Sequence, residues 1–147
     1  MGAYQIVAVG TDGSESSFRA VDRAATIASD AKALLLIICA YRPHRDAAGE
    51  QALGEDAAFH VVGSTPAEET LRDARERAST KGSLEIDTVA VEGDAIERVI
   101  EVVTDRKADL VVIGNRGLNS LTGRLLGSVP QGISRRAGSD VLIVHTT

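Results

Sequence analysis

A glycine-rich segment, residues 114–128, is the part of the chain best suited to chemistry. Gly114, Gly117 and Gly127-Ser128 follow a G-x2-G-x9-G-S spacing, directly after the apolar run 110–113. Glycine lets a backbone approach a ligand closely because it has no Cβ. A loop that opens a helix also presents free N–H groups and the positive end of a dipole to an anion. The spacing therefore predicts a bound phosphate, and with it a nucleotide.

Other chemistries fit the sequence less well. No lysine follows Gly127, as a Walker loop would require, and the dinucleotide fingerprint belongs after the first strand of a fold. The three histidines have no cysteine or carboxylate at metal-ligand spacing. Ser14 and its neighbours indicate the start of a helix rather than a catalytic nucleophile. We therefore expect a binding site without a set of catalytic or metal-binding groups.

Apolar runs and helical spacing alternate along the whole chain. Strands are expected at 6–9, 34–40, 84–91, 109–113 and 140–145, and helices at 14–30, 65–82, 94–103 and 128–137. The run 34–40 is apolar almost throughout, which indicates burial on both faces. Thr65 with Glu68 predicts a capping box, and Gly82 predicts the end of that helix. The pattern indicates one α/β domain over residues 1–147, a parallel sheet with helices on both faces.

In such sheets, ligands bind at the carboxyl ends of the strands, where the strand order reverses. The segments 10–14 and 114–128 follow strands and are rich in glycine, so they would share one crevice if those strands were neighbours. Asp12 fits either a turn-stabilising role or a contact with a ribose or base. Arg116 fits either a phosphate contact or a solvated loop residue.

Composition excludes several partners. The net charge of −5 argues against general nucleic-acid binding, which requires a basic face. No apolar run approaches the roughly 20 residues of a membrane span, and no signal-peptide pattern is present. The single Cys39 cannot form an internal disulfide, and its apolar surroundings predict a buried structural thiol. A cytoplasmic location is expected.

The sequence resembles the universal stress protein family over nearly its whole length. The resemblance rests on GTDGS at 10–14, DLVVIGNRG at 109–117, LLGSV at 125–129 and SDVLIV at 139–144. It implies a five-stranded Rossmann-like sheet, of the adenine nucleotide alpha hydrolase type, in the order 3-2-1-4-5. It also implies an ATP-type site between strands one and four, and a homodimer through the last strand, from Val141 to Val144. The nucleotide-binding residues implied are Gly10, Thr11, Asp12, Cys39 or Ala40, Ile113, Gly114, Arg116, Gly117, Gly127, Ser128 and Val129.

Two local features differ from the family pattern. Pro130 follows Gly-Ser-Val and removes one N–H donor near the phosphate position. The long segment 42–63 carries no recognisable family residues.

The leading hypothesis is a non-catalytic regulator or buffer that binds ATP, with Mg²⁺ as a possible companion, or cAMP, which needs fewer donors. A slow ATPase or nucleotidyl transferase using Asp12, Mg²⁺ and Ser128 is the alternative. A third reading is an interaction module with a vestigial site.

Overall fold

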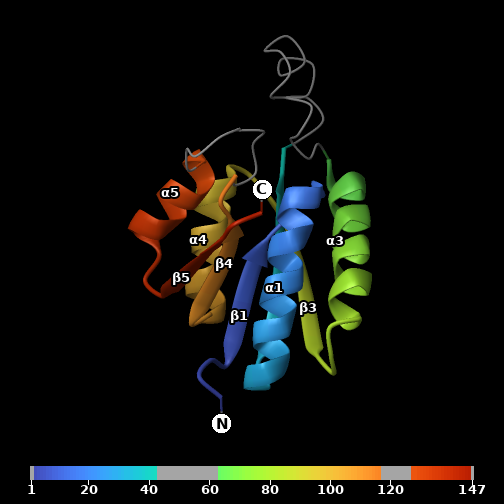
Figure 1. Ribbon diagram of the computed structural model, residues 1–147. Coiled ribbons are helices and arrows are strands. Elements are labelled where there is room, and N and C mark those ends of the chain that lie inside the picture. Colours follow the sequence, from blue (N-terminus) through green and yellow to red (C-terminus); the bar gives the residue numbers. More distant parts are fainter. Residues whose placement is uncertain (1, 43–62, 117–126, 147) are drawn as a thin grey trace.

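The computed structural model describes residues 2–42, 63–116 and 127–146, which form five strands and four helices (Figure 1). The strands are β1 (Ile6–Gly10), β2 (Leu34–Tyr41), β3 (Glu85–Glu92), β4 (Leu110–Gly114) and β5 (Asp140–Val144). The helices are α1 (Glu15–Ala31), α3 (Ser64–Ser79), α4 (Ala95–Arg106) and α5 (Ser128–Arg136). Every strand pair is parallel, and the order is β3-β2-β1-β4-β5. Both the parallel sheet and the implied order are confirmed.

Two of the expected helix starts are built as the sequence predicts. The Ser14 hydroxyl accepts a hydrogen bond from the Ser17 N–H at the start of α1, and the Asp94 carboxylate accepts one from the Glu97 N–H at the start of α4. Each cap satisfies one of the N–H groups that a first helical turn leaves without a partner. Helix α4 runs three residues beyond its predicted end, to Arg106.

The predicted bounds of α3 are wrong at both ends. The helix begins at Ser64, and Gly63, with φ +84°, takes the cap position without a side-chain cap bond, so Thr65 is already inside the helix. Gly63 also donates its N–H to the Arg42 carbonyl at 2.7 Å, a long-range contact that sets where the helix starts. The helix ends at Ser79, before Gly82 is reached, and the Thr80 hydroxyl donates to the Arg77 carbonyl at 2.7 Å in the last turn.

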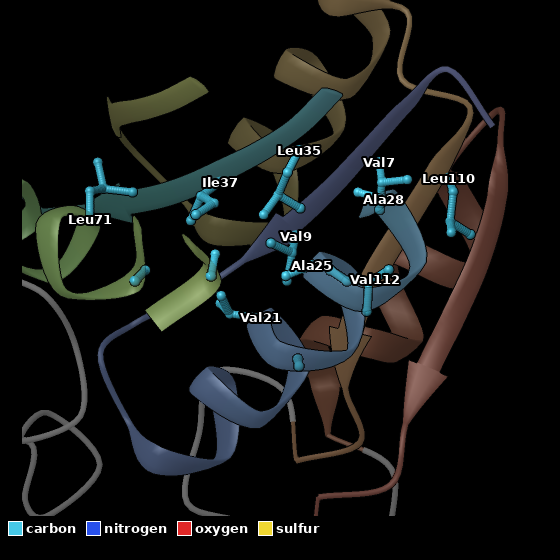
Figure 2. Close-up of a cluster of buried hydrophobic side chains, with 14 of the residues drawn as sticks. Val7, Val9, Val21, Ala25, Ala28, Leu35, Ile37, Leu71, Leu110 and Val112 are labelled. Atoms are coloured by element: carbon cyan, nitrogen blue, oxygen red, sulfur yellow. The ribbon is translucent and has the colours of Figure 1, made fainter. Parts of the chain in front are cut away.

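The sheet carries a hydrophobic core on each face. Figure 2 shows one of them, in which Val9 and Ile37 pack against Val21 and Ala25 of α1, with Leu71 of α3 nearby. The other core lies under α4 and α5. Members of the second core include Ala8, Leu36, Ile38, Val99, Val111, Ile113 and Ile133. Successive residues of β2 alternate between the two cores, and all of Leu35 to Cys39 are fully buried. The predicted burial of β2 on both faces is confirmed.

The sheet has β3 at one edge and β5 at the other, and the edge position of β3 is as predicted. Within the described ranges, no helix is both long enough and apolar enough to cross a membrane.

Candidate functional site

The strand order reverses at β1, which lies between β2 and β4. In the β1–β4 register, Val9 pairs with Val112, so Gly10 and Ile113 come next on neighbouring strands. A Cβ built on Gly10 would lie 3.3 Å from the Ile113 Cδ1. The two glycine-bearing segments therefore leave the sheet side by side at its carboxyl edge (Figure 1). The strands that precede the two segments are neighbours, as a shared crevice requires.

The first segment is organised around the buried hydroxyl of Thr11. This side chain has no exposed surface, and its Oγ1 lies 2.8 Å from the Ser17 Oγ and accepts from the Gly13 N–H at 3.1 Å. The Ser17 hydroxyl donates its single proton to the Ser14 carbonyl at 2.9 Å. Thr11 must therefore be the donor in the Thr11–Ser17 bond. Thr11 was predicted to line the nucleotide site, but its hydroxyl already holds the turn together.

Asp12 stabilises the same turn. Its Oδ1 accepts from the Ser14 N–H at 2.9 Å, which is the local contact that the turn interpretation predicts. Gly13 has φ +86°, a conformation that favours glycine. The Asp12 carboxylate is half-buried, so its contact with a ribose or base stays a prediction.

The second segment is closed at its base by Asn115. The Asn115 N–H donates to the Val144 carbonyl at 2.8 Å, and the Asn115 carbonyl accepts from the Gly127 N–H at 3.0 Å. The main chain of Gly127, predicted to hold phosphate through its N–H, thus already has a protein partner. Gly117 lies outside the described residues. Arg116 is half-buried at the edge of the described part.

Helix α5 starts where this segment returns to the sheet, at the end of the molecule where β4 finishes (Figure 1). Gly127 is its cap residue, and no side chain caps the helix, so Ser128 and Val129 lead its first turn. Pro130 lies in that turn, as predicted, and contributes no N–H. Inside the helix, Gly132 allows close contact with α4, since a Cβ there would lie 2.7 Å from the Ile96 Cδ1.

Cys39 and Ala40, the two residues expected to lie against an adenine, differ in their burial. Cys39 is fully buried in the core under α1 and α3, and burial, with a smaller effect of the Asp12 charge, raises the pKa of its thiol to about 12. Ala40 is half-buried and, by strand alternation, faces the other side of the sheet. Ile113 is fully buried in the second core. Of these three, Ala40 has the exposure that a ligand contact needs.

Sequence reasoning missed one contact beside the site, which Thr146 makes with Asn115. Thr146 is 4% exposed, and both its N–H and its hydroxyl donate to the Asn115 Oδ1 at 2.9 Å. The two residues are 31 positions apart, so no local pattern links them. In residues 2–42, 63–116 and 127–146, no three His, Cys, Asp or Glu side chains are grouped so that they could hold a metal ion.

The chain is similar to known proteins of one family over nearly its whole length. The model of the universal stress protein family matches residues 3–145. The chain is 48% identical to the universal stress protein Rv1636 of Mycobacterium tuberculosis H37Rv over 147 residues, which is 100% of both chains. The crystal structure of a universal stress protein in complex with cAMP has 43% identity and a TM-score of 0.74, with 99% of each chain covered.

A more distant structure has the same fold. The universal stress protein UspA of Lactobacillus plantarum has 18% identity and a TM-score of 0.77, with 96% of this chain and 97% of that chain covered. This protein belongs to the universal stress protein family, and its fold is the adenine nucleotide alpha hydrolase-like fold predicted above.

Proposed function

We propose that this protein binds an adenine nucleotide, with cAMP as its ligand, between the carboxyl ends of β1 and β4. It would act in the cytoplasm as a nucleotide-responsive regulator or buffer, without catalysis. The observation that carries the proposal is the adjacency of β1 and β4 at the point of reversed strand order, where both glycine-bearing segments emerge. A structure 43% identical to this chain is described as a complex with cAMP, which supports the same ligand here.

The number of donors favours one phosphate over three. The Gly127 N–H is bonded to the Asn115 carbonyl, and Pro130 has no N–H. The first turn of α5 also carries the main-chain N–H groups of Ser128 and Val129, at the positive end of a nine-residue helix. Two N–H groups with the Ser128 hydroxyl suit the single charge of a cyclic phosphate better than a triphosphate.

The other site residues take roles set by their positions. Gly10 and Gly114, both buried at the ends of β1 and β4, would let the backbone approach the ribose. Asp12 would bond a ribose hydroxyl while still holding the turn. Ala40 would lie against the adenine. Ile113, fully buried, would support the site from behind. Arg116 and Gly117 complete the proposed set as phosphate contacts.

We also propose a homodimer through β5. This strand is an edge of the sheet, and the side chains of Val141 and Leu142 are only half-buried in the isolated chain. They line an apolar groove with Ile27 and Leu110 beside the Tyr4–Asp140 hydrogen bond. An unpaired edge strand with apolar side chains is suited to pairing with a second copy.

Calorimetric titration of nucleotide-free protein with cAMP and with ATP, each with and without Mg²⁺, tests the ligand. We expect tighter binding of cAMP, unaffected by Mg²⁺. Tighter Mg²⁺-dependent binding of ATP would overturn the choice of ligand, and phosphate release abolished by Asp12→Ala would establish the ATPase alternative. Failure of the protein to bind any nucleotide would leave the interaction-module reading.

Ser128→Ala tests the placement of the site. A hydroxyl bonded to a charged phosphate contributes about 1.5–3 kcal/mol, so we expect cAMP affinity to fall roughly 10- to 100-fold. Ser134→Ala is the matched control, because Ser134 lies on the same helix and its exposed hydroxyl donates to the Gln131 carbonyl of that helix at 2.9 Å. Equal affinities of the two variants would place the phosphate elsewhere.

A further inference from the structure

A partly buried polar cluster links residue 146 to the base of the second glycine-bearing segment. It consists of Ser16, Arg19, Asn115 and Thr146, and we call it the tail cluster. The Ser16 Oγ lies 2.6 Å from the Thr146 Oγ1, and the Arg19 guanidinium donates to the Thr146 carbonyl at 2.5 Å. Thr146 is the buried member of the cluster, with 4% of its surface exposed, whereas the Arg19 side chain is 54% exposed.

The proton directions in the tail cluster follow from counting donors. The Asn115 side-chain atom facing Thr146 must be the oxygen, because it receives the Thr146 main-chain N–H at 2.9 Å. The Thr146 hydroxyl donates its one proton to that same oxygen at 2.9 Å. Ser16 must therefore donate to Thr146. The hydroxyl protons therefore all point the same way, from Ser16 of α1 to Thr146 and from Thr146 to Asn115.

Asn115 transmits this restraint to the proposed site. Its side chain is held by two hydrogen bonds from Thr146, and its main-chain carbonyl accepts from the Gly127 N–H at 3.0 Å. That bond sets where α5 begins relative to the end of β4. Gly114 lies against the same cluster, since a Cβ there would be 3.3 Å from the Thr146 Cγ2 and 3.6 Å from the Ser16 Oγ.

We infer that Asn115 and Thr146 are positioning residues, and that the tail of the chain holds the phosphate-binding part of the site in shape. The inference rests on the proposed function. Neither residue is required to touch the nucleotide. Their effect is to fix the Asn115 carbonyl, and through it the Gly127 N–H and the first turn of α5, in one place.

The test compares Thr146→Val, which keeps the shape but removes the hydroxyl, with Thr146→Ser, which keeps the hydroxyl. Thr104→Val is the matched control, because it removes an exposed hydroxyl that bonds the Ile100 carbonyl within α4. We expect Thr146→Val to lower cAMP affinity about fivefold to tenfold, as for the loss of one hydrogen bond, while Thr146→Ser and Thr104→Val stay within about twofold of the parent.

Two further measurements separate positioning from general damage. Adenosine has no phosphate, so its affinity should be unchanged in Thr146→Val; equal losses for adenosine and cAMP would overturn the inference. The Gly127 amide should exchange with solvent faster in Thr146→Val than in Thr104→Val, with or without nucleotide. Unchanged Gly127 exchange would also overturn it. If the parent chain binds neither compound, the proposed function fails, whereas the exchange measurement still decides whether the tail positions Gly127.

Discussion

Replacement of Thr11 by valine separates a structural from a ligand-binding role at the centre of the candidate site. Thr11 has no exposed surface, and its hydroxyl joins the Gly13 N–H to the Ser17 hydroxyl. Valine has nearly the same shape and lacks both the donor and the acceptor. The variant should therefore lose stability, and its folded form should retain the affinity of the parent for cAMP.

The expected loss of stability follows from the hydrogen bonds that Gly13 and Ser17 still make without the Thr11 hydroxyl. The half-buried Gly13 N–H loses its acceptor but can reach water in part, which places its cost near the lower end of the usual range, about 1 kcal/mol. Ser17 loses an incoming proton but still donates to the Ser14 carbonyl at 2.9 Å, so its cost is also about 1 kcal/mol. We expect a decrease of about 2 kcal/mol in the free energy of unfolding.

Urea unfolding followed by far-ultraviolet circular dichroism measures this decrease. With a slope of about 2 kcal/mol per molar urea, the midpoint should fall by about 1 M. The double variant Thr11→Val/Ser17→Ala should lose less than the sum of the single variants, since the two hydroxyls share one bond. Strict additivity, or a decrease below about 0.5 kcal/mol, would refute the hydroxyl relay. Loss of cAMP binding at unchanged stability would instead place Thr11 in contact with the ligand.

Two further predictions concern the packing of α1 and β2. Arg77, 31% exposed, forms two 2.8 Å hydrogen bonds with Asp22 and lowers the pKa of Glu15, so Arg77→Met should reduce stability by about 1–2 kcal/mol in low salt. The contribution of Glu15 to the free energy of unfolding is present above the ordinary carboxyl pKa and is lost as the pH falls through the lowered pKa of Glu15. Urea midpoints that change equally with pH in the parent and in Arg77→Met would contradict this. The thiol of Cys39, with a pKa of about 12, should react with a disulfide reagent at pH 8 roughly a thousandfold more slowly in the folded than in the unfolded protein, and rapid labelling of the native chain would contradict its burial.

Several features of the fold could be predicted because they depend on local chemistry. Ser14 and Asp94 cap their helices as their residue types indicate, and the unbroken apolar run of β2 lies between two helical layers. Such features need only neighbouring residues and a repeat of two or 3.6. The strand order did not come from these patterns; it was implied by the family resemblance and is present in the structure.

The bounds of α3 show where local patterns are insufficient. Thr65 and Glu68 form a plausible capping box in sequence, yet the helix starts at Ser64, where the Gly63 N–H is bonded to the Arg42 carbonyl. The partner lies 21 positions earlier in the chain, so a pattern of neighbouring residues does not reveal this contact.

The sequence by itself determined where the glycines, the caps and the apolar runs stand, and so which kind of sheet could form and which segments could approach a phosphate. Only the tertiary structure decided what those segments' polar groups do. Thr11 is occupied within its own turn, and the Gly127 N–H is bonded to Asn115, which in turn is held by Thr146. The physical reason is that a hydrogen-bonding group takes whichever partner the folded chain brings within about 3 Å. Parallel strands bring together residues that the sequence keeps far apart.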